Sequence, residues 1–361
     1  MARLTADLVK ARALEIGFDL CGIAPAGDFP ELTFLDEWLA RGYAGEMGYM
    51  TRSAERRADV RAVMPSARTV IVTATAYNTD RPYSTSPQGG PARARISRYA
   101  WGDDYHTVIE RRLEALVAWM RAESDEPFEA RPYVDTGPVQ ERVYAQYAGV
   151  GWIGKNTCVI AGKRGSWLFL SEILCSLPLE ADAPAVDRCG TCTRCLDACP
   201  TDAIRAPGVL DSTRCISYLT IELKTAIPEP LRAPMGTHVY GCDICQDVCP
   251  WNRAPLVSVR PEWQPRAGLD APALTDLWAR SDDDLRALLK GSPMKRAGIK
   301  RLRRNLAVAM ANSDDPAAHA ALDAPADDPA RPSLADPLVA EHVAWARERV
   351  RLRRESAVAN L

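Results

Sequence analysis

The cysteines of this 361-residue chain stand at spacings that could build a redox cofactor. The run CGTCTRCLDACP, beginning at Cys189, has the C-x2-C-x2-C-x3-C-P spacing of bacterial two-cluster ferredoxins, in which three cysteines hold one 4Fe-4S cluster and the fourth holds the other. The second run, CDICQDVCP, has Val239 where its first cysteine should stand. Cys215 is the unused cysteine between the two runs, and we expect it to replace the missing ligand.

This spacing divides eight thiols between two 4Fe-4S clusters. The expected ligands are Cys189, Cys192, Cys195 and Cys249 for one cluster, and Cys199, Cys215, Cys242 and Cys245 for the other. A pair of zinc sites is the alternative, but the interleaved spacing followed by proline fits cubane clusters better than zinc ribbons. Of the remaining cysteines, Cys21 and Cys175 are expected to be small buried hydrophobic residues, and Cys158 stays open.

The stretch GVGWIGKN, residues 149–156, has the G-x-G-x-x-G spacing of a dinucleotide-binding turn. That turn requires a strand before the glycines and a helix after them. Here Val139, Val143 and Tyr147 predict a helix before the glycines, and the apolar segments that follow predict strands. The order is reversed, so the motif does not indicate a nicotinamide or flavin site.

The composition is that of a globular protein, with 47% hydrophobic residues, 25% charged residues and a net charge of -2. No apolar run is long enough to span a bilayer, and the first twenty residues show helical periodicity rather than a secretory signal. We therefore expect a cytoplasmic protein that does not associate with a membrane. In a reducing compartment, eleven cysteines favour metal ligation or redox chemistry over disulfides.

The elements that must position these thiols predict an α+β protein of three parts. Residues 1–180 alternate helical segments with the short apolar strands FDLCGIAP, ARTVIVTATAY and SWLFLSEIL, which indicates a mixed α/β domain. Residues 181–256 form a ferredoxin-like domain, in which metal replaces much of the core. Residues 257–361 return to a helical pattern that resembles a HEAT-like repeat fragment, without a clean sequence period.

Several segments in order along nearly the whole chain resemble the epoxyqueuosine reductase family. They are SRYAWGDDYH (97–106), YVDTGPVQER (133–142), GWIGKNTC (151–158), the two cysteine runs and GSPMKRAGIKRLRRN (291–305). The resemblance implies a cobalamin-dependent enzyme that reduces epoxyqueuosine to queuosine in the anticodon loop of tRNA. It also implies an external low-potential electron donor and a monomer.

Cobalamin itself is implied by the resemblance only. A histidine ligand to cobalt requires D-x-H-x-x-G, and the segment that begins at Asp104 has Ile109 in place of the glycine. This failure agrees with the base-off cobalamin, without a histidine ligand, that the family uses. His106 is then expected to be a hydrogen-bonded neighbour of the site. By the same resemblance, the corrin contacts include Arg57, Tyr99, Asp135, Gly154, Asn156 and Cys158.

Asp135, in the segment VDTGP, has two interpretations. From the residues alone, it starts a turn or caps a helix that begins at Pro138. The resemblance instead places the catalytic proton donor on this residue. A dry pocket over the corrin ring would then raise the pKa of its carboxyl group.

A basic segment near the C-terminus is expected to bind tRNA. Its cations are Lys295, Arg296, Lys300, Arg301, Arg303 and Arg304. No acid interrupts them, whereas Ile299, Leu302, Leu306 and Met310 form an apolar face that would anchor the helix. Two other functions stay open: a cobalamin-dependent reductive dehalogenase, and a ferredoxin-type electron carrier.

Overall fold

The computed structural model describes residues 4–86, 90 and 92–359. Its first half is built on a four-stranded antiparallel sheet in the order β1-β2-β7-β4. The strands of this sheet are β1 (Leu20–Pro25), β2 (Thr69–Ala76), β7 (Leu168–Cys175) and β4 (Ala130–Tyr133). Every residue of β2 is buried, because helices cover both faces of the sheet.

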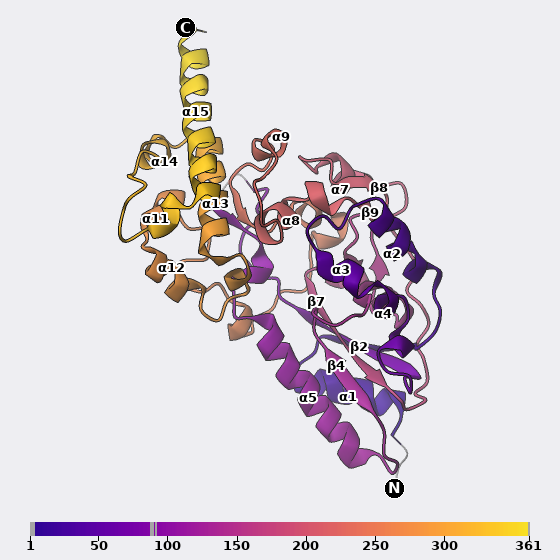
Figure 1. The fold of residues 1–361 in the computed structure, drawn as a ribbon. Coiled ribbons are helices and arrows are strands. Elements are labelled where there is room, and N and C mark those ends of the chain that lie inside the picture. Colours follow the sequence, from indigo (N-terminus) through magenta and orange to yellow (C-terminus); the bar gives the residue numbers. More distant parts are fainter. Residues whose placement is uncertain (1–3, 87–89, 91, 360–361) are drawn as a thin grey trace.

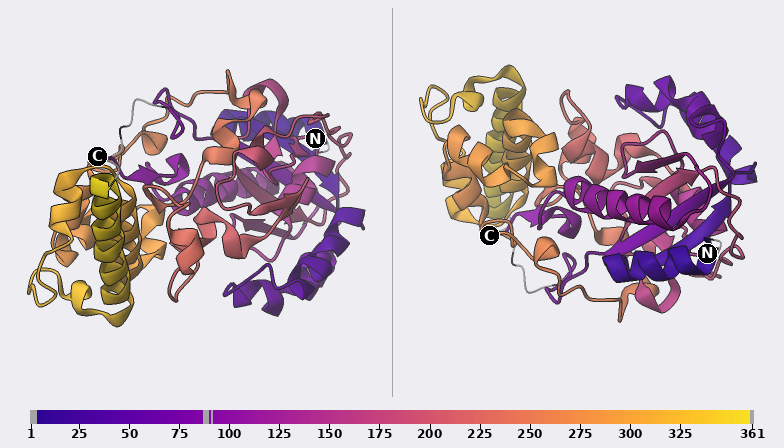
Figure 2. Two further views of the ribbon diagram at one scale, coloured as in Figure 1. Left: turned by 90° about the horizontal axis from the view of Figure 1, so that it is seen from above. Right: turned by 90° about the horizontal axis from the view of Figure 1, so that it is seen from below.

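The two faces of the sheet bury different sets of apolar side chains. Ile71 and Ile173 face α1 (Ala6–Ile16) and α5 (Tyr105–Glu123), which lie along one side of the sheet (Figure 2). Val72 and Leu174 point to the opposite side, which α2 (Pro30–Ala40) and α6 (Glu141–Tyr147) cover. This alternation is the period of two expected of strands whose faces contact different layers. The short helices α3 (Gly48–Arg52) and α4 (Ala54–Ala58) follow α2.

The cysteine-rich region contains only short elements. They are α7 (Arg194–Asp197), β8 (Ile204–Ala206), β9 (Val209–Leu210), α8 (Ile216–Ile221), α9 (Glu229–Arg232), β10 (His238–Tyr240) and α10 (Ile244–Asp247). The strands β5 (Trp152–Ile153) and β6 (Val159–Ile160) precede this region in the chain and pack against it through Trp152 and Ile160. Strand β10 pairs in parallel with β3 (Arg95–Ile96), which joins this region to a segment far away in the sequence.

The C-terminal region is helical and lies at one end of the molecule (Figure 1). Its helices are α11 (Leu274–Ala279), α12 (Asp282–Leu289), α13 (Gly298–Asn312), α14 (Pro316–Ala321) and α15 (Pro337–Ala359). Residues Leu302 to Ala311 of α13 are all buried, so this helix is the centre of the region rather than its surface. Ala94, Ile96 and Trp101 join the same hydrophobic core, although they precede it by about two hundred residues.

These observations match the coarse expectation of mixed helices and strands. The predicted strands in FDLCGIAP, ARTVIVTATAY and SWLFLSEIL are β1, β2 and β7. Helix α6 does precede β5 around the glycine-rich turn, which is the reverse of a dinucleotide-binding unit. Among the helices of the described residues, none is sufficiently long and apolar to cross a membrane.

Candidate active site and cluster sites

Asp135 lies in the turn between β4 and α6. Its backbone is in the left-handed region, with φ of 56°, a conformation that few non-glycine residues adopt. Its carboxylate accepts a hydrogen bond from the Tyr105 hydroxyl at 2.7 Å, and its side chain is 52% exposed. The helix-cap interpretation is wrong, because α6 begins at Glu141 with Gln140 as its N-cap and no side-chain cap. The carboxylate is therefore free to face a ligand.

His106 links Asp135 to the first turn of α5. Its Nδ1 lies 2.8 Å from Asp104 Oδ1, and its Nε2 lies 3.4 Å from Asp135 Oδ2. Asp104 is buried and also pairs with Lys295 Nζ at 2.7 Å. Burial lowers the pKa of His106, but the contacts to Asp104 and Asp135 outweigh burial and raise the pKa to about 9. At neutral pH this imidazole carries a proton.

The same contacts correct our expectation for Asp135. Burial raises the pKa of its carboxyl group, but the contacts from His106 and Tyr105 outweigh burial and leave the pKa below the usual value. A dry pocket alone was expected from the sequence, whereas the structure places a cation next to the carboxylate. At neutral pH the imidazole of His106 therefore holds the proton of this pair, and the Asp135 carboxylate is the more exposed of the two groups.

Two further carboxyl groups lie behind the Asp135 turn. Glu141 Oε1 accepts a hydrogen bond from the Asp135 backbone N–H at 2.7 Å. Glu172, in the middle of β7, is 0% exposed, and neither of its carboxyl oxygens has a donor among the described residues. Burial and the charge of Asp135 raise the pKa of Glu141 to about 7, and burial with the charge of Glu141 raises the pKa of Glu172 well above its usual value. Burial therefore favours the protonated form of Glu172.

The other residues that the resemblance assigned to the corrin lie in two places. Tyr99 packs edge-to-face against Tyr105, with ring centroids 6.1 Å apart, and so stands next to the Asp135 site. Arg57, at the end of α4, donates to Ser53 Oγ at 2.9 Å and to the Val139 carbonyl at 3.0 Å. The bond to Val139 holds the helix against the segment that follows Asp135, whereas Ser53 lies at the start of the same helix.

Gly154, Asn156 and Cys158 form a turn that contacts the cysteine-rich region. Asn156 is buried, donates to the Cys245 carbonyl at 3.2 Å and accepts from the Cys158 N–H at 3.2 Å. A Cβ on Gly154 would come within 2.6 Å of Ile160 Cδ1 and 2.9 Å of Asn156 Oδ1, so a larger residue there would displace these side chains. A hydrogen bond with Cys245 lowers the pKa of the Cys158 thiol. This turn thus joins the domain of Asp135 to the predicted cluster ligands.

The thiols predicted for the first cluster surround one small cavity. Its volume is about 40 Å³, and Cys189, Cys192, Cys195 and Cys249 line it. Lys155 spans the first loop and donates to the carbonyls of Gly190 and Cys192 at 2.6 and 3.0 Å.

The thiols predicted for the second cluster are also neighbours. Burial raises the pKa of Cys242, and the nearby thiols of Cys215 and Cys199 raise it further. Cys245 is affected in the same way by Cys242 and Cys215. Cys215 therefore lies near Cys242 and Cys245 of the second run, as expected of the residue that replaces its missing ligand.

The ligand sets fit cubanes better than single ions. Within the described ranges, no three histidine, cysteine or acidic side chains converge closely enough to hold one metal ion. Four thiolates per group are the ligands that a 4Fe-4S cluster takes, and the cavity inside the first group leaves room between its thiols.

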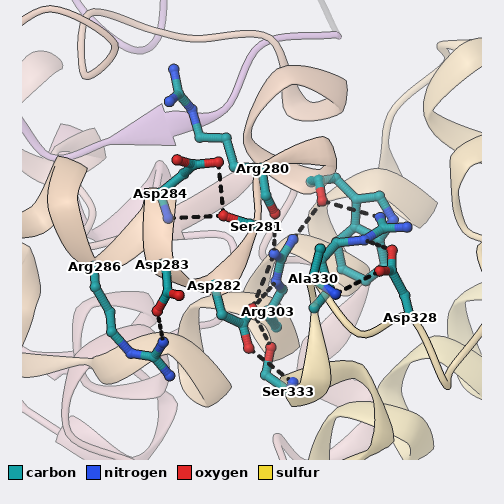
Figure 3. Close-up of polar contacts among 12 residues, drawn as sticks. Arg280, Ser281, Asp282, Asp283, Asp284, Arg286, Arg303, Asp328, Ala330 and Ser333 are labelled. Carbon is teal, nitrogen blue, oxygen red and sulfur yellow. Dashed lines mark hydrogen bonds and ion pairs between the residues drawn. The ribbon is translucent and has the colours of Figure 1, made fainter.

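The basic segment does not form one exposed surface, and two of its predicted tRNA contacts are wrong. Arg303 and Arg304 are 0% exposed. Figure 3 shows Arg303 reaching inward to Asp282, and its guanidinium also donates to the carbonyls of Trp278 and Arg280. Arg304 donates to the carbonyls of Leu219, Leu223 and Thr225. These cations join α13 to its neighbours, so no phosphate can reach them.

The remaining cations of the segment are more accessible. Lys295 and Lys300 are 62% and 67% exposed at the side chain, and Arg296 is 43% exposed while it pairs with Glu222. Arg301 is partly buried and donates to the carbonyl of Ile221. A signal for the buried arginines was present in the sequence, because the following LAVAMA is apolar on every face and predicts a buried helix.

Sequence reasoning also missed Tyr105, Glu141 and Glu172 as parts of the site. Tyr105 and Glu141 lie inside segments that carried the family resemblance. Glu172 stands alone in the apolar run LFLSEILC, and a charged residue in the middle of a buried strand is a signal of special chemistry.

Two family profiles match parts of this chain, and known proteins match it over most of its length. Residues 188–252 match the 4Fe-4S double cluster binding domain, and residues 57–136 match the profile described as epoxyqueuosine reductase QueG, DUF1730. The epoxyqueuosine reductase of Pseudomonas aeruginosa is 42% identical over 350 residues, which cover 96% of this chain and 95% of that protein. The Xanthomonas campestris enzyme is 41% identical over 344 residues, 94% of each chain.

Solved structures agree with these matches. A crystal structure of epoxyqueuosine reductase with an epoxyqueuosine-modified tRNA-Tyr stem loop superimposes with a TM-score of 0.82 and 31% identity, over 95% of this chain and 89% of that one. A Bacillus subtilis epoxyqueuosine reductase, whose catalytic aspartate loop is swung out of the active site, gives a TM-score of 0.82 at 29% identity and covers 95% of this chain and 90% of that one. With an active-site turn, two groups of four thiols and these full-length relatives, the chain belongs to the epoxyqueuosine reductase family.

Proposed function

We propose that this protein reduces epoxyqueuosine to queuosine in the anticodon loop of tRNA, with Asp135 as the group that delivers a proton to the departing oxygen. The supporting observation is the half-exposed Asp135 carboxylate, held by Tyr105 and backed by a protonated His106. The family assignment supports an oxidoreductase, and one relative has been crystallised with the modified stem loop. A reductive dehalogenase or a simple electron carrier would not account for these full-length relatives.

The reaction needs two electrons and two protons, because the epoxide oxygen leaves as water and a carbon–carbon double bond forms. Asp135 is the shortest route for a proton, since its carboxylate is the exposed end of the pair with His106. His106 holds this proton between Asp104 and Asp135 and passes it through the Asp135 carboxylate to the departing oxygen, which leaves His106 neutral. Lys295 keeps Asp104 ionised, because the His106 and Lys295 contacts both lower the pKa of Asp104.

Cobalamin is the cofactor that we propose next to Asp135. Bound in a base-off form, it would supply a strongly reducing cobalt centre for opening the epoxide. Tyr99 and Asp135 lie at one side of the proposed site, and Asn156 and Cys158 lie against Cys245 at the cluster side. No histidine other than His106 lies in these segments, and His106 is engaged by two carboxylates. That engagement fits a cofactor without a histidine ligand.

The protein contains a double 4Fe-4S cluster domain, and we propose that its clusters connect an external low-potential donor to the site. Each cluster would take the four thiols that the structure groups together. The first group lies close to the surface, since its loop residues Thr191, Thr193 and Arg194 are exposed. The second group contacts Asn156 and Cys158. Electrons would therefore enter at the first group and leave from the second.

The domain limits 1–180, 181–256 and 257–361, the HEAT-like character of the last of these and a monomeric state also belong to this proposal. For tRNA, the exposed cations Lys295, Arg296 and Lys300 remain as proposed phosphate contacts, with Arg301 at their edge. Lys295 connects this surface to the active site through Asp104.

The substitution Asp135→Asn tests the acid role. Asparagine tolerates the left-handed backbone and can accept the Tyr105 hydrogen bond, but it cannot supply a proton. We expect turnover of an epoxyqueuosine-containing stem loop to fall about a hundredfold or more, with both clusters and cobalamin binding retained. Asp103→Asn, on an exposed neighbouring residue, is the matched control. Turnover near that of the parent in Asp135→Asn, with a strong chemical reductant in excess, would refute the acid role.

A further inference from the structure

The turn that carries Asp135 requires something to hold it in place. Asp135 is a non-glycine residue in the left-handed region, a conformation that is disfavoured unless the surroundings enforce it. The Thr136 N–H bonds the Val134 carbonyl at 2.5 Å, which closes the turn locally but does not fix it to the protein. The hydrogen bond from the Asp135 N–H to Glu141 at 2.7 Å does so, because Glu141 is the first residue of α6.

Glu141 is in turn supported by a second carboxyl group, that of Glu172 in the interior of the protein. Glu172 pairs across the sheet with Val72 on β2 and Tyr133 on β4, in the interior of the protein. Its side chain reaches Glu141, and it has no other hydrogen-bond donor among the described residues. A buried carboxylate without a donor is strongly disfavoured, whereas a carboxylic acid that donates to a neighbouring carboxylate is satisfied.

No nearby cation removes the need for this shared proton. The guanidinium of Arg57 bonds Ser53 and the Val139 carbonyl, and that of Arg142 bonds the Thr157 carbonyl at 2.9 Å. The other titratable groups around the pair are Asp135, His106 and Tyr105 on the active-site side, with Tyr49 and Arg296 acting on Asp135 from farther away. Two adjacent carboxyl groups without a bonded cation hold one proton between them.

We propose that Glu141 and Glu172 share a single proton and act together as a latch that holds the Asp135 turn in its active position. Glu141 is the positioning residue, because its carboxylate binds the Asp135 backbone. Glu172 is its proton-bearing support. The latch rests on the proposed role of Asp135, and it adds a second titration to the site. Because the pKa of Glu172 is raised well above its usual value, Glu172 keeps the shared proton as pH rises through about 7, where Glu141 ionises and becomes the stronger acceptor for the Asp135 N–H.

Two substitutions separate the parts of the latch. Glu172→Gln keeps the shape and places a permanent N–H donor against Glu141, so it mimics the protonated pair at every pH. Glu141→Ala removes the acceptor of the Asp135 N–H. Glu180→Gln, on an exposed residue at the end of the same region, is the control that should change nothing.

The first readout is amide hydrogen exchange of residues 133–140 in the cluster-loaded full-length protein. We expect exchange there to become about five- to tenfold faster in Glu141→Ala, the effect of losing one hydrogen bond, and to stay at the parental rate in Glu172→Gln. In the parent, exchange beyond its intrinsic pH dependence should increase as pH falls below about 7, where Glu141 takes up a proton and becomes a weaker acceptor, and in Glu172→Gln this increase should move to lower pH. Parental exchange in Glu141→Ala would overturn the latch.

The second readout is the infrared band of a protonated carboxyl group at neutral pH. We expect the parent to show this band and Glu172→Gln to lack it, whereas its presence unchanged in Glu172→Gln would overturn the shared proton. Turnover gives the third readout, with a fall below about pH 7 in the parent that moves to lower pH in Glu172→Gln. If Asp135→Asn proves fully active, the acid role fails, but exchange and infrared data still decide the latch.

Discussion

Replacing Arg303 by methionine should destabilise the protein without weakening its binding to tRNA. The guanidinium is 0% exposed and lies 3.2 Å from Asp282, which is 2% exposed. Methionine fills much of the space but leaves the Asp282 carboxylate with only the Ser333 N–H and hydroxyl, at 2.9 and 2.7 Å. It also removes donors from the carbonyls of Trp278 and Arg280.

The size of this effect follows from burial. Removing one partner of a buried ion pair costs about 3–5 kcal/mol, because the other charge stays in the interior. In a protein of this size, 1 kcal/mol lowers the melting temperature by about 2 °C, so we expect a fall of roughly 6–10 °C. Lys300→Met is the matched control, since Lys300 is 67% exposed in its pair with Asp336. An exposed pair contributes less than about 1 kcal/mol.

The assay combines thermal unfolding with stem-loop binding over a series of salt concentrations. Arg303→Met should bind the stem loop with parental affinity and an unchanged salt dependence at a temperature where it is folded. The double substitution of Lys295 and Lys300 by methionine should weaken binding and reduce the slope by about 0.7 for each phosphate that is no longer neutralised. A melting temperature within a degree of the parent in Arg303→Met, or a lower salt slope in that variant, would refute the division into buried and exposed cations.

Two further predictions concern the clusters and the stored proton. Cys215→Ala should lose one cluster, so that the iron content per chain falls by about half. The control Cys158→Ser should keep the parental iron content. Equal iron in the parent and in Cys215→Ala would exclude Cys215 as a ligand. Asp104→Asn removes a carboxylate that raises the pKa of His106, so the loss of turnover that follows deprotonation of His106 should move from about pH 9 to lower pH. This is best measured above about pH 7, where Glu141 is already ionised, and an unmoved profile would mean that His106 does not hold the catalytic proton.

The folding stability of the protein should also depend on the protonation of His106, with a sign given by linkage between proton binding and folding. The pKa of His106 is raised in the folded protein, so its charged contacts stabilise the fold fully below its ordinary pKa near 6.5. That stabilisation is lost as pH rises through about 9. Thermal unfolding of His106→Gln against the parent at pH 6 and pH 9.5 would therefore show a larger difference at the lower pH.

The spacing of residues along the chain was enough to predict the chemistry of the cysteines. Ligands two or three residues apart lie on one loop, so their geometry is local and can be read from the order of residues. The reversed order of helix and strand around Gly154 was also predicted correctly, because it depends only on the periodicity of neighbouring segments. The strands β1, β2 and β7 were found for the same reason.

Contacts between distant segments could not be predicted in this way. His106 of α5 contacts Asp135 of the β4–α6 turn, and Asp104, which holds His106, also pairs with Lys295 from a segment nearly two hundred residues later. Their meeting changes which group carries the proton, because a cation beside a carboxylate opposes the effect of burial. Burial itself is likewise a property of the whole fold. The charges of Arg303 and Arg304 were visible in the sequence, but only the packing of α13 among its neighbours decided that both lie inside.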